Sequence, residues 1–244
     1  MNKVVSDFVT GIKYFFNGIF LLSHKELRRY ILLPLLVNII FFAVPFAVLI
    51  HYYANIDLYI VHHLPPWLSV LSILAKLFVF FIYIVIMLYS FFTVATIIAA
   101  PFNGYLAEKV ALQKGHLLEE KSWTAILCDT PRLIGRQLMI LVLYVPIALL
   151  LTVLLLVPLL HALILVIWIW FHARMMALIY LDYPTDNAGV SLQSLRMWMS
   201  GNKALVFGFG GSVLMFSAIP ILNFFVIPAS VIAATHIWVD KGQR

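Results

Sequence analysis

Residues 138–181 form an apolar tract that constrains the fold of this chain more than any other feature. The tract runs for about 44 residues, roughly twice the length of one membrane-spanning helix, and Arg174 is its only charged residue. Pro158 lies near its middle and divides it into two arms of about 22 residues. We therefore expect a helical hairpin over residues 137–181.

The composition of the whole chain agrees with a membrane location. Only 11% of the 244 residues are charged, whereas soluble globular proteins have about a quarter. Several apolar runs have helical length, and none shows sustained alternation of apolar and polar residues. The sequence predicts an all-α integral membrane protein whose residues 1–244 form a single membrane domain.

Three further elements are expected before the hairpin. Residues 1–22 place apolar side chains at spacings of three and four with polar ones opposite, which predicts an amphipathic helix lying along the membrane interface. Ser23 and Glu26 form a capping box that starts a new helix. Long apolar runs then predict spanning helices over residues 27–53 and 67–110.

Two elements are expected after it. An interfacial or cytoplasmic helix is predicted over residues 188–203 and a second hairpin over residues 204–240. The arms of this second hairpin should meet between Ile219 and Asn223. Each arm then has about 16 residues, or about 24 Å, which is short of a bilayer core of about 30 Å. We expect that these arms do not fully cross.

The distribution of basic residues predicts the orientation. The first 29 residues and residues 109–136 each hold five Lys or Arg, whereas residues 51–66 hold none. Because cytoplasmic loops carry an excess of Lys and Arg, we expect a cytoplasmic N-terminus.

Several function classes have little support. The net charge of +6 comes from basic residues spread over membrane-flanking segments, so nucleic-acid binding is discarded. The single cysteine, Cys128, cannot build a disulfide or a thiolate metal cluster, and we expect no metal site and no cofactor. No nucleophile or nucleotide motif is visible, so we do not expect an enzyme. The glycines of residues 208–212 indicate close helix packing.

Arg28 and Arg29 stand side by side on the first turns of the first predicted span. One interpretation is an oxyanion site, because a helix N-terminus offers free backbone N–H groups and two guanidinium groups add fork-shaped donors. The other is that the pair fixes topology or binds anionic lipid. Sequence physics alone leaves both interpretations open.

A series of residues in fixed order resembles the bacterial CysZ sulfate permeases of the inner membrane, which feed assimilatory sulfate reduction and cysteine synthesis. The resemblance covers nearly the whole chain, and its blocks are Gly18, Leu27–Arg28–Arg29, Pro34, Asn38, "PFNGYLAE", "DYPTDN" and "IPILNFFVIPASVIAATHIWVD".

This resemblance implies two long spanning helices, hairpins that penetrate only partly, and inward passage of sulfate. It makes Arg28 and Arg29 the main anion contacts and assigns amide donors to the backbone of Glu26 and Leu27. Lys25 and Glu26 stand where the family often has a proline and a small residue.

Other polar residues are weaker candidates for a pore or for a charge network at the cytoplasmic mouth. Asn38 could line a pore or bond another helix, and Arg174 could join the network or extend to the membrane surface. The full set is Asn38, Asn103, Glu108, Arg174, Asp182 and Asp186.

The sequence thus predicts a channel-like sulfate permease. Since two full spans cannot enclose a pore, a homo-oligomer is expected, with sulfate and membrane lipid as partners. The competing hypothesis is a non-transporting scaffold or assembly protein that binds anionic lipid. An enzyme acting on lipid head groups is disfavoured.

Overall fold

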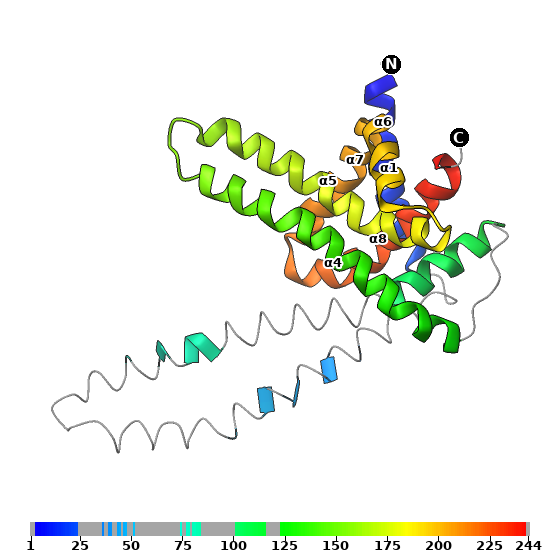
Figure 1. The fold of residues 1–244 in the computed structure, drawn as a ribbon, viewed down its shortest axis with the longest axis horizontal. Coiled ribbons are helices and arrows are strands. Elements are labelled where there is room, and N and C mark those ends of the chain that lie inside the picture. Colours follow the sequence, from blue (N-terminus) through cyan, green and yellow to red (C-terminus); the bar gives the residue numbers. More distant parts are fainter. Residues whose placement is uncertain are drawn as a thin grey trace. The chain divides into compact units, whose positions relative to one another are not determined.

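The computed structural model describes residues 3–23, 101–115 and 123–242, together with scattered positions between 36 and 83. In these parts every regular element is a helix (Figure 1). One helix covers residues 101–113. The others are α1 (Lys3–Leu21), α4 (Trp123–Leu154), α5 (His161–Asn187), α6 (Leu192–Gly201), α7 (Lys203–Ser217) and α8 (Pro220–Lys241).

The chain divides into two compact units. Residues 1–31 and 100–244 form the first, and residues 32–99 form the second. The described positions of the second unit are helical. The predicted spans over residues 27–53 and 67–110 lie mostly outside the described residues. The C-terminal end of the second predicted span, residues 101–110, belongs to the helix over residues 101–113.

The first hairpin is built from α4 and α5, which pack against each other as two long arms (Figure 1). The reversal lies in residues 155–160, around Pro158. The arms have 32 and 27 residues, longer than the expected arms of about 22. Residues Cys128–Leu154 and His161–Asn187 are each long and apolar enough to cross a membrane, and so is α1. The hairpin therefore has the length for full crossing, whereas the resemblance implied partial penetration.

The second hairpin reverses earlier than expected. α7 ends at Ser217 and α8 begins at Pro220, so the turn lies at Ala218 and Ile219. The expectation that the turn extends to Asn223 is wrong, because the Asn223 amide already donates to the Ile219 carbonyl at 2.9 Å. The physical reason is Pro220, whose fixed φ and missing N–H suit the first position of a helix. The arms have 15 and 22 residues.

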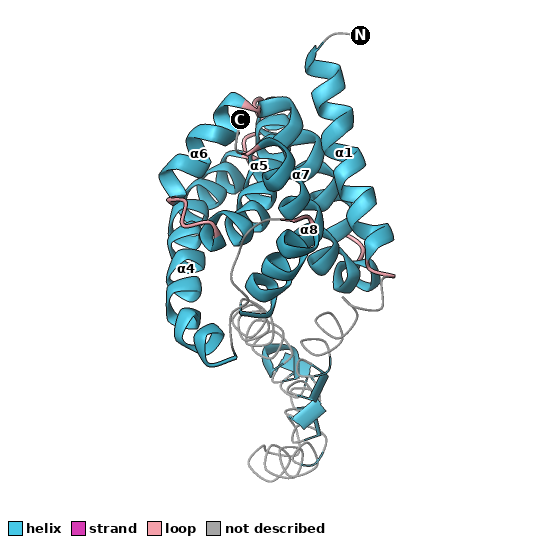
Figure 2. Ribbon diagram, turned by 90° about the vertical axis from the view of Figure 1, so that its right-hand side faces the viewer, coloured by secondary structure: helices cyan, strands magenta, loops and turns pink. Residues whose placement is uncertain are grey.

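α1 lies directly against α7 and α8 (Figure 2). Gly11 and Gly208 lie at its crossing with α7. A Cβ at Gly11 would collide with the Leu205 carbonyl oxygen, and one at Gly208 with the Phe8 carbonyl oxygen. The two backbones are therefore in contact, which only glycine permits at these positions.

Glycine also permits close packing at two further crossings. A Cβ at Gly18 would collide with the Ala229 carbonyl oxygen of α8, and one at Gly210 with the Ala173 carbonyl oxygen of α5. The predicted role of residues 208–212 in helix packing is thus confirmed for Gly208 and Gly210. Gly211 faces open space. Around these crossings, large side chains from several helices are fully buried: Phe15, Leu181, Phe209, Val213, Ile232 and Ile237.

Candidate functional site

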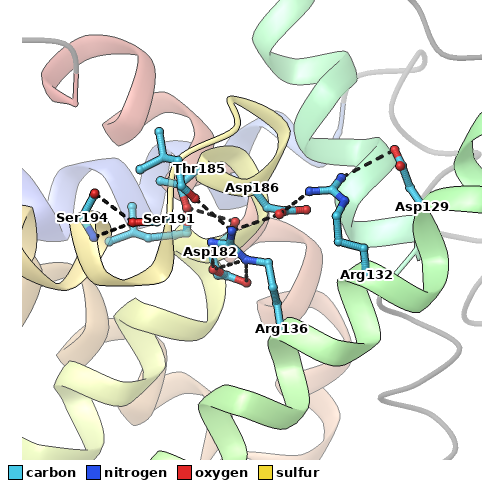
Figure 3. Close-up of polar contacts among 10 residues, drawn as sticks. Asp129, Arg132, Arg136, Asp182, Thr185, Asp186, Ser191 and Ser194 are labelled. Carbon is cyan, nitrogen blue, oxygen red and sulfur yellow. Dashed lines mark hydrogen bonds and ion pairs between the residues drawn. The ribbon is translucent and has the colours of Figure 1, made fainter.

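Charged side chains of opposite sign face each other between α4 and α5 (Figure 3). Arg132 and Arg136 are four residues apart on α4, and Asp182 and Asp186 are four residues apart on α5. Because four residues bring a helix back to nearly the same face, each pair forms a short ladder. We call these four residues the Arg–Asp clamp.

Arg136 is the centre of the clamp. Its Nε donates to both oxygens of Asp182, at 3.1 and 3.3 Å, and its Nη2 donates to Oδ1 of the same carboxylate. Its Nη1 donates to the Val190 carbonyl at 2.9 Å and lies 3.1 Å from Oδ1 of Asp186. One guanidinium therefore connects α4 to two carboxylates and to the chain that follows α5.

Arg132 forms the outer part of the clamp. Its Nη1 donates to Oδ1 of Asp186, and its Nη2 lies 3.6 Å from Oδ2 of Asp129, three residues earlier on α4. Its side chain is 44% exposed, whereas that of Arg136 is 18% exposed. Of the two arginines, Arg136 is therefore the more shielded from water.

The end of α5 places the Val190 carbonyl where Arg136 can reach it. Gly189 follows the helix with φ of +71°, a left-handed conformation that ends helices and suits glycine. The Val190 amide donates back to the Thr185 carbonyl at 2.9 Å. Ser191 then caps α6, since its Oγ accepts from the Ser194 amide (Figure 3).

Burial decides the chemistry of the clamp. The Asp182 and Asp186 side chains are each 1% exposed, and buried carboxylates need partners. Together with Asp129, the group holds three carboxylates and two guanidinium groups, so its formal charge is −1 when all five groups are ionised. Its arginines are already occupied by carboxylates. The clamp can therefore fix the hairpin in place, and it leaves few free donors for an anion.

The helix over residues 101–113 packs beside the clamp. Asn187, the last residue of α5, donates from Nδ2 to the Gly104 carbonyl at 2.7 Å. Asn103 donates to the Tyr183 hydroxyl at 3.4 Å. Asn103 is 7% exposed and Glu108 is 3% exposed. Buried polar side chains are therefore present both in the clamp and on the adjacent helix over residues 101–113.

The far end of the same helix is attached to α8 and α1. Lys114 Nζ lies 2.9 Å from both carboxylate oxygens of Asp240, and the Tyr14 hydroxyl donates to Oδ2 of Asp240 at 2.9 Å. The exposed fractions of the Lys114 and Asp240 side chains are 28% and 35%. This attachment is more open to water than the clamp.

The structure separates Arg174 from the other network candidates. Asp182 and Asp186 lie together, but their cations are Arg132 and Arg136. Arg174 instead donates to Ser200 of α6. The candidates Glu26, Leu27, Arg28, Arg29 and Asn38 lie outside the described residues. In the described parts of the chain, no group of three or more His, Cys, Asp or Glu residues is arranged to hold a metal ion.

Sequence reasoning missed Arg132 and Arg136 as partners of the two aspartates. It used them only as basic residues that indicate orientation. The available signal was a pair of arginines at spacing four, next to one arm of a hairpin, and a pair of aspartates at spacing four, next to the other. In a hairpin these two ends lie side by side.

Comparisons with known proteins agree over nearly the whole chain. The profile of the family described as sulfate transporter CysZ/etoposide-induced protein 2.4 matches residues 14–228. The chain is 36% identical over 237 residues to the sulfate transporter CysZ of Pectobacterium atrosepticum, covering 96% of this chain and 86% of the relative.

Two further relatives carry the same name. The sulfate transporter CysZ of Pseudomonas aeruginosa is 35% identical over 241 residues, with 97% of each chain covered. That of Vibrio parahaemolyticus is 36% identical over 249 residues, covering 99% of this chain and 100% of the relative. This similarity and the apolar helices of membrane-crossing length show that the protein is a helical membrane protein. The chain belongs to the family described as sulfate transporter CysZ/etoposide-induced protein 2.4.

Proposed function

We propose that this protein is a sulfate permease of a bacterial inner membrane, with its N-terminus in the cytoplasm, and that it is not an enzyme. The observation that carries the proposal is the full-length similarity to relatives named sulfate transporter CysZ. The apolar arms α4 and α5 are consistent with it, since each is long enough to cross a membrane.

The anion contact is proposed at Arg28 and Arg29, with amide donors from Glu26 and Leu27. Two adjacent guanidinium groups at a helix start provide the donors that a divalent oxyanion needs. The clamp supports this choice indirectly, because carboxylates already occupy Arg132 and Arg136. Passage is proposed to be channel-like and to require several copies of the chain.

The test is uptake of radiolabelled sulfate into liposomes that contain the purified protein. Arg28→Ala/Arg29→Ala should lower uptake at limiting sulfate by about tenfold or more, because each charged hydrogen bond contributes roughly 1.5 to 3 kcal/mol. Lys3→Ala/Lys13→Ala is the matched control, since it removes the same charge from exposed positions of α1. The control should retain uptake.

The outcomes separate two questions. Equal uptake by wild type and Arg28→Ala/Arg29→Ala, at equal incorporation, would overturn the anion site. Absence of uptake by the wild-type protein would overturn the permease itself and would favour a scaffold that binds anionic lipid.

A further inference from the structure

Arg174 and Arg196 form a second basic site, remote in sequence from Arg28 and Arg29. Arg174 lies in α5, and its Nη2 donates to the Ser200 hydroxyl of α6 at 3.0 Å. The same nitrogen lies 3.5 Å from the Arg196 carbonyl, to which Ser200 also donates at 2.8 Å. The Arg174 guanidinium is thereby held over α6, beside the residue that carries a second guanidinium.

These two arginines lack the partners that the clamp arginines have. Within the described part of the chain, no carboxylate forms an ion pair with Arg174 or Arg196, whereas Arg132 and Arg136 both pair with aspartates. The Arg174 guanidinium instead lies beside the backbone of Arg196, which carries a second positive charge. Two like charges held together without a counter-ion favour binding of an anion.

The donors needed for an oxyanion are free in this arrangement. Arg174 uses only Nη2 in its hydrogen bonds to described residues, so Nε and Nη1, which point in different directions, are each free to donate a single hydrogen bond. Arg196 is exposed and donates no side-chain hydrogen bond to the described residues. Guanidinium forks match phosphate geometry in two-point contacts.

The surroundings indicate which oxyanion binds. Trp170 lies one turn before Arg174 on the same face of α5 and is 47% exposed, and Ile167, one further turn away, is 39% exposed. Met197, next to Arg196, is 62% exposed. An exposed apolar face that ends in tryptophan and arginine offers an apolar surface for acyl chains and a cationic group for a phosphate. A free inorganic anion would gain nothing from this apolar surface.

We propose that Arg174 and Arg196 bind the phosphate of an anionic phospholipid, whose acyl chains lie along the apolar face of α5. Ser200 is a positioning residue, because it holds the Arg174 guanidinium. The site does not depend on sulfate transport, so it can be present or absent whatever the uptake experiment shows.

The test follows the thermal unfolding of the purified full-length protein in dodecyl maltoside while dioctanoyl phosphatidylglycerol is added. A ligand that binds the folded state raises the melting temperature. Dioctanoyl phosphatidylcholine and sodium sulfate are added in parallel at matched ionic strength. Phosphatidylglycerol should raise the melting temperature more than either of these.

Arg196→Gln should raise the phosphatidylglycerol concentration needed for half of the shift by about fivefold, the usual effect of one basic residue at a lipid surface. Arg174→Gln/Arg196→Gln should remove the difference between the two lipids. Lys203→Gln is the matched control, because it removes one exposed charge at the start of the adjacent helix α7. It should leave the half-shift concentration unchanged.

Three results would overturn the proposal. One is a phosphatidylglycerol shift that survives in Arg174→Gln/Arg196→Gln. Another is an equal loss in Lys203→Gln, which would indicate unspecific attraction. The third is an arginine-dependent shift that sodium sulfate produces as well as phosphatidylglycerol does, which would make this a free-anion site. Arg196→Gln changes only an exposed side chain, so its folding is not in question.

Discussion

Arg136 and Asp182 pair across the interface of α4 and α5, and two guanidinium nitrogens, Nε and Nη2, donate to Oδ1 of the carboxylate. The partners are 46 residues apart in the chain. Water barely reaches the carboxylate, whose side chain is 1% exposed. The pair therefore fixes how the two arms of the hairpin lie against each other, which is the main structural role of the clamp.

Removing one member of this pair should destabilise the protein strongly. Asp182→Ala leaves Arg136 half-paired in a dry interface, and we expect a loss of about 3 kcal/mol, measured by thermal unfolding in detergent. Asp129→Ala should cost less than about 1 kcal/mol, because the Asp129 side chain is 30% exposed and its contact with Arg132 is 3.6 Å long. Equal losses in the two variants would contradict the dominance of the buried pair.

Glycine at the crossing of α1 and α7 gives a second prediction. Gly208→Ala places a methyl group against the Phe8 carbonyl oxygen and should destabilise the protein by about 1 to 3 kcal/mol. Gly211→Ala, on the same helix, meets open space and should be neutral or stabilise by up to about 1 kcal/mol. Unfolding curves of the two variants should therefore shift in opposite directions or by clearly different amounts. A harmless Gly208→Ala would mean that the helices are not in backbone contact.

The sequence predicts a helix or a hairpin well where the pattern that indicates it lies within one continuous segment of the chain. The tract over residues 138–181 required a hairpin, and a proline near its centre marked the reversal. The glycines of residues 208–212 predicted close packing because small residues have few other uses in apolar helices. Periodicity also found α1, since its apolar face is continuous.

The rest depends on register between helices, which periodicity along one helix does not contain. Arg136 meets Asp182 only because the two arms have a particular length and offset. The turn was expected between Ile219 and Asn223, and it lies at the N-terminal edge of that range because Pro220 favours the first position of α8. Arg174 lies on α5 like the aspartates, yet its face is directed to α6, so sharing one helix did not mean sharing one site.

The link between Lys114 and Asp240 gives a pH prediction. Burial opposes ionisation of Asp240, but hydrogen bonds from Lys114 and Tyr14 outweigh it, and the pKa of Asp240 lies below its usual value. A carboxyl group whose pKa is lower in the folded than in the unfolded state stabilises the protein at pH values above the unfolded-state pKa of about 3.9. This stabilisation is lost as the pH falls below that value.

Asp240→Asn should therefore lower the melting temperature at pH 7, by an amount equivalent to about 1 kcal/mol or less because the pair is partly exposed. The difference between wild type and variant should shrink when both are measured below about pH 3.5. A difference that grows toward acid pH would reverse the sign and refute the assignment of Lys114 and Tyr14 as donors to an ionised Asp240.

Asn187 should control how firmly the helix over residues 101–113 is attached to the end of α5. Its amide donates to the Gly104 carbonyl at 2.7 Å, whereas the bond from Asn103 to Tyr183 is 3.4 Å long and correspondingly weaker. Asn187→Ala removes the shorter bond and should cost about 1 to 2 kcal/mol locally.

The measurement is amide hydrogen exchange, which reports local opening. Exchange in residues 105–113 should become about five- to thirtyfold faster in Asn187→Ala, while exchange in α7 stays unchanged. Asn103→Ala is the matched comparison and should accelerate the same amides less. If the two variants were equal, or if α7 responded as well, the attachment would be shared by the whole core, and the contact between Asn187 and Gly104 would not hold the helix by itself.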